Sequence, residues 1–227
     1  MIPASRTAIL ALVAVFAASS LAYFGVSTYR KRELQKAVSE LVKDASQRLD
    51  QALAIEKDPA AANSPQIVIR LDDQAQEVDK HVIELRGMSA APNRALADAA
   101  EEYLLTVRQI LRSQAASHRY LLQVTASDQA LRDHMRTAGQ RSRGWIEEAV
   151  REKEQMERAY FNYRLSSDAF GRLLDSYPDA RGKLAAHVGA RLLLGDEASR
   201  DARKRVTAAS KRVADEVERA RQLAAVR

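Results

Sequence analysis

Apolar residues recur along most of this 227-residue chain at steps of three and four, which is the period of one face of an α-helix. The clearest example lies between two proline-containing segments, at residues 58–65 and 89–93. Its apolar positions are Val68, Leu71, Ala75, Val78, Val82 and Leu85. This narrow seam is typical of helices that pack in bundles or coiled coils.

Breaks in the pattern divide the chain into separate helices. Prolines, glycines and short polar stretches mark the breaks, because each disfavours the interior of a helix. The predicted helices cover approximately residues 30–57, 66–87, 93–125, 128–177, 179–194 and 197–226. Pro178 predicts the helix end at 177, and the polar turn 125–128 predicts the helix end at 125. Asn93 is predicted to cap the helix that follows it.

A long apolar run precedes these helices. The 23 residues from Thr7 to Tyr29 carry no charge, and at 1.5 Å per residue they are long enough to cross the ~30 Å hydrocarbon core of a bilayer. The run predicts a membrane anchor with Tyr23 and Tyr29 at the interface. The small residues at 20–22 leave a cleaved signal peptide as the alternative.

The helical period continues past the apolar run without a proline or glycine before Pro59. We therefore expect the transmembrane helix to continue into the first helix of the soluble part, to about Lys57. The predicted fold is all-α: a single N-terminal transmembrane helix that continues into an elongated antiparallel helical bundle or coiled coil. The predicted divisions are a tail and anchor (1–29), a membrane-proximal bundle (30–126) and a C-terminal helical region (127–227).

Basic residues lie directly after the anchor, at Arg30, Lys31 and Arg32, whereas Arg6 alone precedes it. This asymmetry favours a soluble part in the cytoplasm, with the periplasm as the alternative, because many anchors with short N-terminal tails export the rest of the chain. The same three residues are expected to contact anionic lipid. The 27 arginines, 9 lysines and 41 alanines suggest a bacterial genome rich in GC, and hence the bacterial inner membrane.

The composition excludes several classes of chemistry. Without cysteine there is no disulfide, thiolate metal site, cysteine nucleophile or lipidated cysteine. None of the four histidines has a glutamate three residues before it, as a di-iron bundle would require. The stretch 139–146 lacks the lysine of a phosphate-binding loop, and Ser142 lacks the glycine of a nucleophile elbow. We therefore expect no enzyme activity, no metal and no cofactor.

Two groups of side chains are candidates for contact with a partner or ligand. His118 lies on the apolar seam of its helix, either as a ligand-contacting or pH-sensing residue or as a bundle histidine with polar neighbours. Tyr160, Phe161 and Tyr163 form an aromatic cluster, which is either a contact surface or part of the core. His81 is expected to form a surface ion pair with neighbouring glutamates on its own helix.

The chain has a net charge of +6, and its last helix is rich in basic residues. The candidate basic face consists of Arg203, Lys204, Arg205, Lys211 and Arg212. Acidic residues alternate with them, which favours a solvated coiled-coil surface over one that binds nucleic acid. Nucleic acid is therefore not an expected partner.

Together these features predict a non-enzymatic, single-pass bacterial membrane protein. It would act as a helical scaffold, tether or assembly factor through contacts with a partner protein or a second copy. In architecture it resembles the membrane-anchored coiled-coil scaffolds of bacterial division and envelope assembly. The alternative is an extracytoplasmic sensory bundle that binds a ligand, because the long first helix also resembles that of chemoreceptor sensing domains.

Overall fold

The structure, a computed structural model, is all-helical. It describes the backbone of residues 4–57, 64–136 and 142–225, and within these ranges the side chains of residues 26–222. The elements are α1 (Ala4–Ile55), α3 (Pro65–Gly87), α4 (Arg94–Arg136), α5 (Arg143–Val188), the short 3₁₀ helix η1 (Ala190–Leu192) and α6 (Asp196–Ala225). No strand occurs in this part of the chain, and the predicted all-α helical bundle is confirmed.

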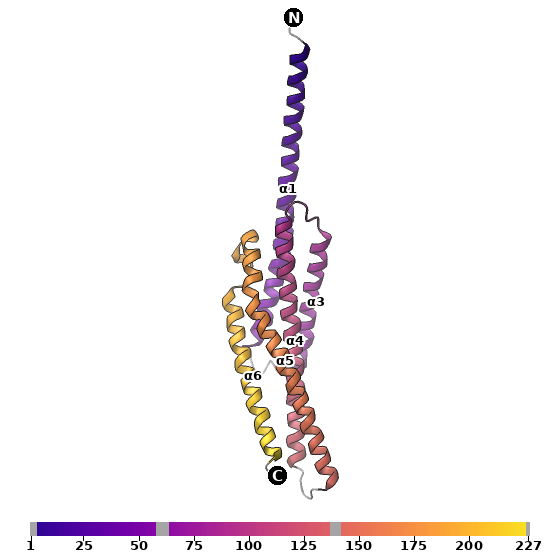
Figure 1. Ribbon diagram of the computed structural model, residues 1–227, viewed down its shortest axis with the longest axis vertical. Coiled ribbons are helices and arrows are strands. Elements are labelled where there is room, and N and C mark those ends of the chain that lie inside the picture. Colours follow the sequence, from indigo (N-terminus) through magenta and orange to yellow (C-terminus); the bar gives the residue numbers. More distant parts are fainter. Residues whose placement is uncertain (1–3, 58–63, 137–141, 226–227) are drawn as a thin grey trace.

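Helix α1 is continuous from Ala4 to Ile55, and its N-terminal part stands clear of the bundle (Figure 1). Leu34 is its first buried side chain among those described. No helix within the searched, described residues is both long and apolar enough to cross a bilayer. The predicted span from Thr7 to Tyr29 falls mainly on residues whose side chains lie outside that set.

The other helices run up and down around α4, which lies at the centre of the bundle (Figure 1). A large core fills the end near the exposed part of α1, where all five α-helices contribute buried side chains. A smaller distal core joins the C-terminal part of α4 to α5 and α6. It consists of Val124, Leu131, Met156, Ala159, Tyr163, Val213, Val217 and Ala220.

Local sequence signals set the beginning of α4 and the buried face of α3. All six seam residues predicted for α3 are buried, together with Ile67. Asn93 caps α4 as predicted, because its side-chain Oδ1 accepts a hydrogen bond from the backbone N–H of Leu96 at 3.2 Å. The predicted apolar seam of α3 and the predicted cap at Asn93 are both confirmed.

The predicted break at residues 125–128 is wrong, because α4 continues to Arg136. The Thr125 hydroxyl donates to the carbonyl of Leu121 at 3.0 Å, so this polar side chain is satisfied inside the helix. Asp128, near which the next helix was predicted to begin, instead pairs with Arg132 one turn later in the same helix at 2.8 Å. Helix α5 accordingly begins at Arg143 and not at 128, and the chain reverses between α4 and α5 (Figure 1).

The predicted stop before Pro178 is also wrong, because α5 continues through it to Val188. An internal proline costs a helix about 3 kcal/mol. Here Ala180 and Leu184 continue the buried face beyond the proline, and burial of apolar side chains offsets such a cost. Gly189, with φ of 86°, then ends the helix, and η1 replaces the rest of the predicted helix 179–194.

A chain of hydroxyl groups crosses the large core from α1 to Leu194, in the connection between η1 and α6. The Tyr177 hydroxyl donates to the carbonyl of Leu194 at 2.9 Å. It lies 3.2 Å from the Tyr103 hydroxyl, which in turn lies 2.6 Å from the hydroxyl of Ser46. Because the carbonyl can only accept, all hydrogen bonds are made when Ser46 donates to Tyr103 and Tyr103 donates to Tyr177. Burial raises the pKa of both tyrosines, so the hydroxyls keep their protons.

We predict that Tyr177→Phe lowers the free energy of unfolding by about 1–2 kcal/mol, because it removes the donor to the carbonyl of Leu194 and takes from the buried Tyr103 hydroxyl one of its two partners, leaving Ser46. Thermal and denaturant unfolding of the full-length protein measures the loss. Tyr160→Phe, which changes a half-buried tyrosine outside the hydroxyl chain, is the control. A loss of stability no larger than that of the control would contradict the role of the hydroxyl chain.

Candidate functional site

The residues predicted to lie at the membrane interface are exposed on α1. Tyr29, Arg30, Lys31 and Arg32 all project from the helix where it leaves the bundle, whereas the side chain of Tyr23 lies outside the described residues. A cavity of about 640 Å³ opens at the same level. Its lining comes from α1 and from the connection between α3 and α4, and consists of Val26, Ser27, Arg30, Glu33, Leu34, Ala37, Met88, Ser89, Ala91 and Pro92. This end of the bundle thus combines basic groups with an apolar recess.

The candidate basic face of α6 does not act as one surface. Arg203 lies against Gly171, where a Cβ atom would meet its guanidinium, and pairs with Asp175 of α5 at 3.1 Å. Lys204 pairs with Asp201 on its own helix at 3.6 Å. Arg205 and Arg212 line the cavity beside Glu56 and His118, and both Arg212 and Lys211 are exposed. Two of the five basic residues thus form ion pairs within the chain, while Lys211 and Arg212 remain exposed.

His118 is buried at the junction of the two cores, where it meets the end of α1. Its Nε2 lies 2.9 Å from Oε1 of Glu56. Gln114 donates to the same carboxylate oxygen at 3.0 Å and to the carbonyl of Ala52 at 2.9 Å. These contacts tie the last turn of α1 to the middle of α4.

The electrostatics of this site follow from its burial. Burial alone would raise the pKa of Glu56, but the hydrogen bond and charge of His118 and the hydrogen bond from Gln114 outweigh it, so the pKa is lowered. The adjoining cavity measures about 200 Å³ and is also lined by Tyr163, Ser167 and Arg205. It holds donors and acceptors suited to a small polar molecule.

The three predicted aromatic residues on α5 have different environments. Tyr163 is buried in the distal core, Tyr160 packs half-buried against it, and Phe161 is 60% exposed. Burial raises the pKa of Tyr163, although hydrogen bonds with Ser210 and Ser167 act in the opposite direction. Only Phe161 therefore presents its ring to a partner.

Phe161 belongs to a larger exposed apolar face that the sequence analysis missed. The other members are Ile146, Val150 and Leu165, with exposed fractions of 50, 51 and 53%. At 100° per residue all four lie within a sector of about 100° on α5. We call them the α5 contact face. The four residues form two pairs, Ile146 with Val150 and Phe161 with Leu165, which are separated by Glu154 and Arg158 and together span just over five turns of α5.

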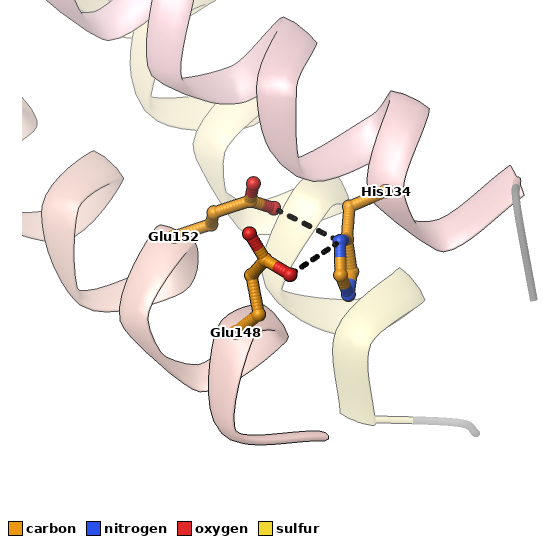
Figure 2. A group of neighbouring side chains, drawn as sticks. All are labelled: His134, Glu148 and Glu152. Carbon is orange, nitrogen blue, oxygen red and sulfur yellow. Dashed lines mark ion pairs between the residues drawn. The ribbon is translucent and has the colours of Figure 1, made fainter. Parts of the chain in front are cut away.

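One further group of side chains is suited to binding a metal ion. His134 near the end of α4 meets Glu148 and Glu152 of α5, and their ligand atoms all lie within 4.8 Å of one another (Figure 2). His81, by contrast, pairs with Asp44 of α1 at 2.6 Å, and not with the predicted neighbours on its own helix. In the sequence, the spacing of four places Glu148 and Glu152 on the same face of a helix. That spacing points to a metal site only when the chain is known to reverse between α4 and α5, which brings His134 to that face.

The chain matches no known protein-family model, and comparisons with curated proteins and with solved structures find no match either.

We predict that Glu56→Gln lowers the free energy of unfolding at pH 7 by about 1–3 kcal/mol, because it weakens the hydrogen bonds that join this largely buried carboxylate to His118 and Gln114. The pKa of Glu56 is lowered in the folded state, so its contribution is present above the unfolded pKa of about 4.3 and is lost as pH falls below it. The difference between the two proteins should therefore shrink in acid.

The matched control is Asp44→Asn, which alters the histidine–carboxylate pair with His81 at a site where Asp44 is 39% exposed. Its cost should stay below about 1 kcal/mol, since solvent screens the pair. Unfolding curves between pH 3 and 7 make the comparison. The prediction fails if the two variants lose the same free energy of unfolding, or if the loss for Glu56→Gln does not change with pH. Either result would show that burial does not determine the strength of the contact between Glu56 and His118.

Proposed function

We propose that this protein is a non-enzymatic, single-pass membrane scaffold that associates with a second copy through the α5 contact face. The observation that carries the proposal is the exposure of Ile146, Val150, Phe161 and Leu165 on one side of one helix. Exposed large apolar residues aligned on a helix are typical of contact surfaces. The absence of catalytic sequence motifs supports a role in assembly.

The form of α1 supports a membrane anchor. It is a single helix of 52 residues, and its N-terminal part stands apart from the bundle (Figure 1). The uncharged run in that part is long enough to cross a bilayer. Because such an anchor would be continuous with α1 of the bundle, it would fix the distance and orientation of the packed helices relative to the membrane.

The surroundings of α1 at the top of the bundle suit a membrane surface. Arg30, Lys31 and Arg32 would contribute roughly 1 kcal/mol each in contact with an anionic leaflet. The 640 Å³ cavity beside Arg30 offers both apolar and basic groups, which fits a lipid headgroup with part of its acyl chain. The positive charge after the apolar run favours a bundle in the cytoplasm.

Copies anchored in one membrane would hold their α5 contact faces at the same height. A parallel, two-fold contact then places each apolar residue opposite its own counterpart, as symmetric dimers require. Between the apolar pairs, Glu154 and Arg158 lie one turn apart with opposite charges, paired at 3.3 Å. Each copy thus offers an acid and a base to the other, so the charged middle of the face does not oppose association.

A ligand-sensing bundle is the second candidate, favoured by the cavity beside Glu56 and His118. Its volume of about 200 Å³ is below the roughly 300–1,000 Å³ of most small-molecule sites. Only a compact polar ligand would fit. The scaffold proposal is preferred because the α5 contact face extends over a much larger part of the molecule.

We predict that single cysteines at Val150 or Phe161 give covalent dimers of the full-length protein under mild oxidation. The natural chain has no cysteine, so every disulfide reports on the introduced site. In a parallel pair these positions meet their own counterparts closely enough for a disulfide, which needs Cα atoms about 4.4–6.8 Å apart. Non-reducing electrophoresis of membranes detects the product.

Gln155→Cys is the matched control, because Gln155 is exposed on α5 but about 120° around the helix from Phe161. It should remain monomeric. Dimers formed only when Val150→Cys and Phe161→Cys chains are mixed would mean an antiparallel pair. That result, or equal cross-linking at all three positions, would contradict the proposed parallel contact.

We also predict that a C-terminal fusion to green fluorescent protein fluoresces in bacterial cells, whereas a fusion to alkaline phosphatase is inactive. The expected reason is that the basic residues after the apolar run keep the bundle in the cytoplasm. Activity and fluorescence are compared with the amount of each fusion in the membrane fraction. Active phosphatase with a dark fluorescent fusion would instead place the bundle in the periplasm and favour the sensory candidate.

A further inference from the structure

The hairpin of α4 and α5 brings three metal-binding side chains together at its tip. His134 lies two residues before the end of α4, while Glu148 and Glu152 lie one turn apart near the beginning of α5. Ser142 fixes that beginning, because its hydroxyl accepts a hydrogen bond from the backbone N–H of Trp145 at 3.2 Å. Both carboxylates point toward the imidazole (Figure 2).

The imidazole is held in one orientation by Trp145. The His134 ring stacks on the indole ring, with centroids 4.8 Å apart and an interplanar angle of 23°. Its Nε2 lies 3.0 Å from the carbonyl oxygen of Trp145. A carbonyl oxygen can only accept a hydrogen bond, so Nε2 carries a proton and a neutral ring has its lone pair on Nδ1.

That Nδ1 atom faces both carboxylates. It lies 4.0 Å from Oε2 of Glu148 and 4.0 Å from Oε2 of Glu152 (Figure 2). The Glu152 oxygen is itself buried and makes no hydrogen bond with the described residues. Three electron-pair donors therefore surround one point, and a cation at that point satisfies all of them.

We propose that His134, Glu148 and Glu152 bind a divalent transition-metal ion, with Zn²⁺ the best match. One imidazole and two carboxylates are ligands that zinc accepts, at about 2.0–2.2 Å. A tetrahedral site places its ligand atoms roughly 3.3 Å apart. The observed 4.0 Å distances need to close only slightly, and Glu148, with a side chain 57% exposed, has room to move.

The surroundings of His134 match those of a metal ligand. Histidines that bind metals usually donate their other ring N–H to a carbonyl or carboxylate, which fixes the tautomer. The bond from Nε2 to the Trp145 carbonyl does this. Three protein ligands leave at least one position for water or for a side chain of another molecule. The site goes beyond the proposed function, because it joins α4 to α5 whether or not the protein dimerises.

The test is a titration of the untagged full-length protein with ZnCl₂ by calorimetry, and with CoCl₂ by visible absorption. The natural chain should bind one equivalent of each metal, and the cobalt spectrum should show the bands of a four-coordinate ion. Zinc should also raise the midpoint of thermal unfolding. His134→Gln, Glu148→Gln and Glu152→Gln should each weaken binding at least tenfold.

His81→Gln is the matched control, because His81 also pairs with a carboxylate but has no second carboxylate in such a group among the described residues. It should bind as the natural chain does. Circular dichroism checks that each variant is folded, and the exposed position of Glu148 makes its variant a safe substitute if His134→Gln unfolds. Weak or non-stoichiometric binding by the natural chain would overturn the proposal, as would binding unchanged in all three variants. Cysteine cross-linking at the α5 contact face tests the proposed function separately.

Discussion

The fold depends on covering the apolar stripe of α4. Most of the stability of an amphipathic helix comes from packing of its apolar face, so along the 43 residues of α4 the neighbouring helices must bury that stripe. Near the exposed part of α1, buried residues such as Tyr103 and Leu104 are enclosed by several helices. Toward the other end only α5 and α6 cover α4, and they bury just two of its apolar side chains, Val124 and Leu131. The decreasing number of neighbours divides one helical bundle into two cores.

Local signals predicted the fold well where they agree with the packing. The seam of α3 and the cap at Asn93 depend on spacing and on one side chain, and both were found from the sequence. The errors at 125–128 and at Pro178 have the opposite cause. There the local preference is to break the helix, but Leu131 and Leu184 continue the buried face beyond the break. Tertiary burial outweighed local propensity, and single-sequence reasoning cannot measure that burial.

The same limit hid the functional candidates. In one continuous helix His134 and Glu148 would be about 21 Å apart, so the misplaced break concealed their meeting. His118 was recognisable as a polar residue on an apolar seam, but its partner Glu56 lies on another helix, 62 residues away in the sequence. The exposure of Ile146 and Val150 likewise depends on which side of α5 faces α4. Residue types and spacing were visible in the sequence, whereas the pairing of distant helices was not.

The two proposals meet in the first turns of α5. Glu148 and Glu152 lie on the side that faces α4, and Ile146 and Val150 lie about 200° around the same helix. A cation held against His134 would therefore fix the rotation of these turns and, with it, the direction of the apolar residues on the opposite side. The distal core supplies little burial in this part of the hairpin, since Met156 is the first fully buried α5 residue described. Because few α5 side chains are buried in these turns, such a site would contribute directly to how the contact face is presented.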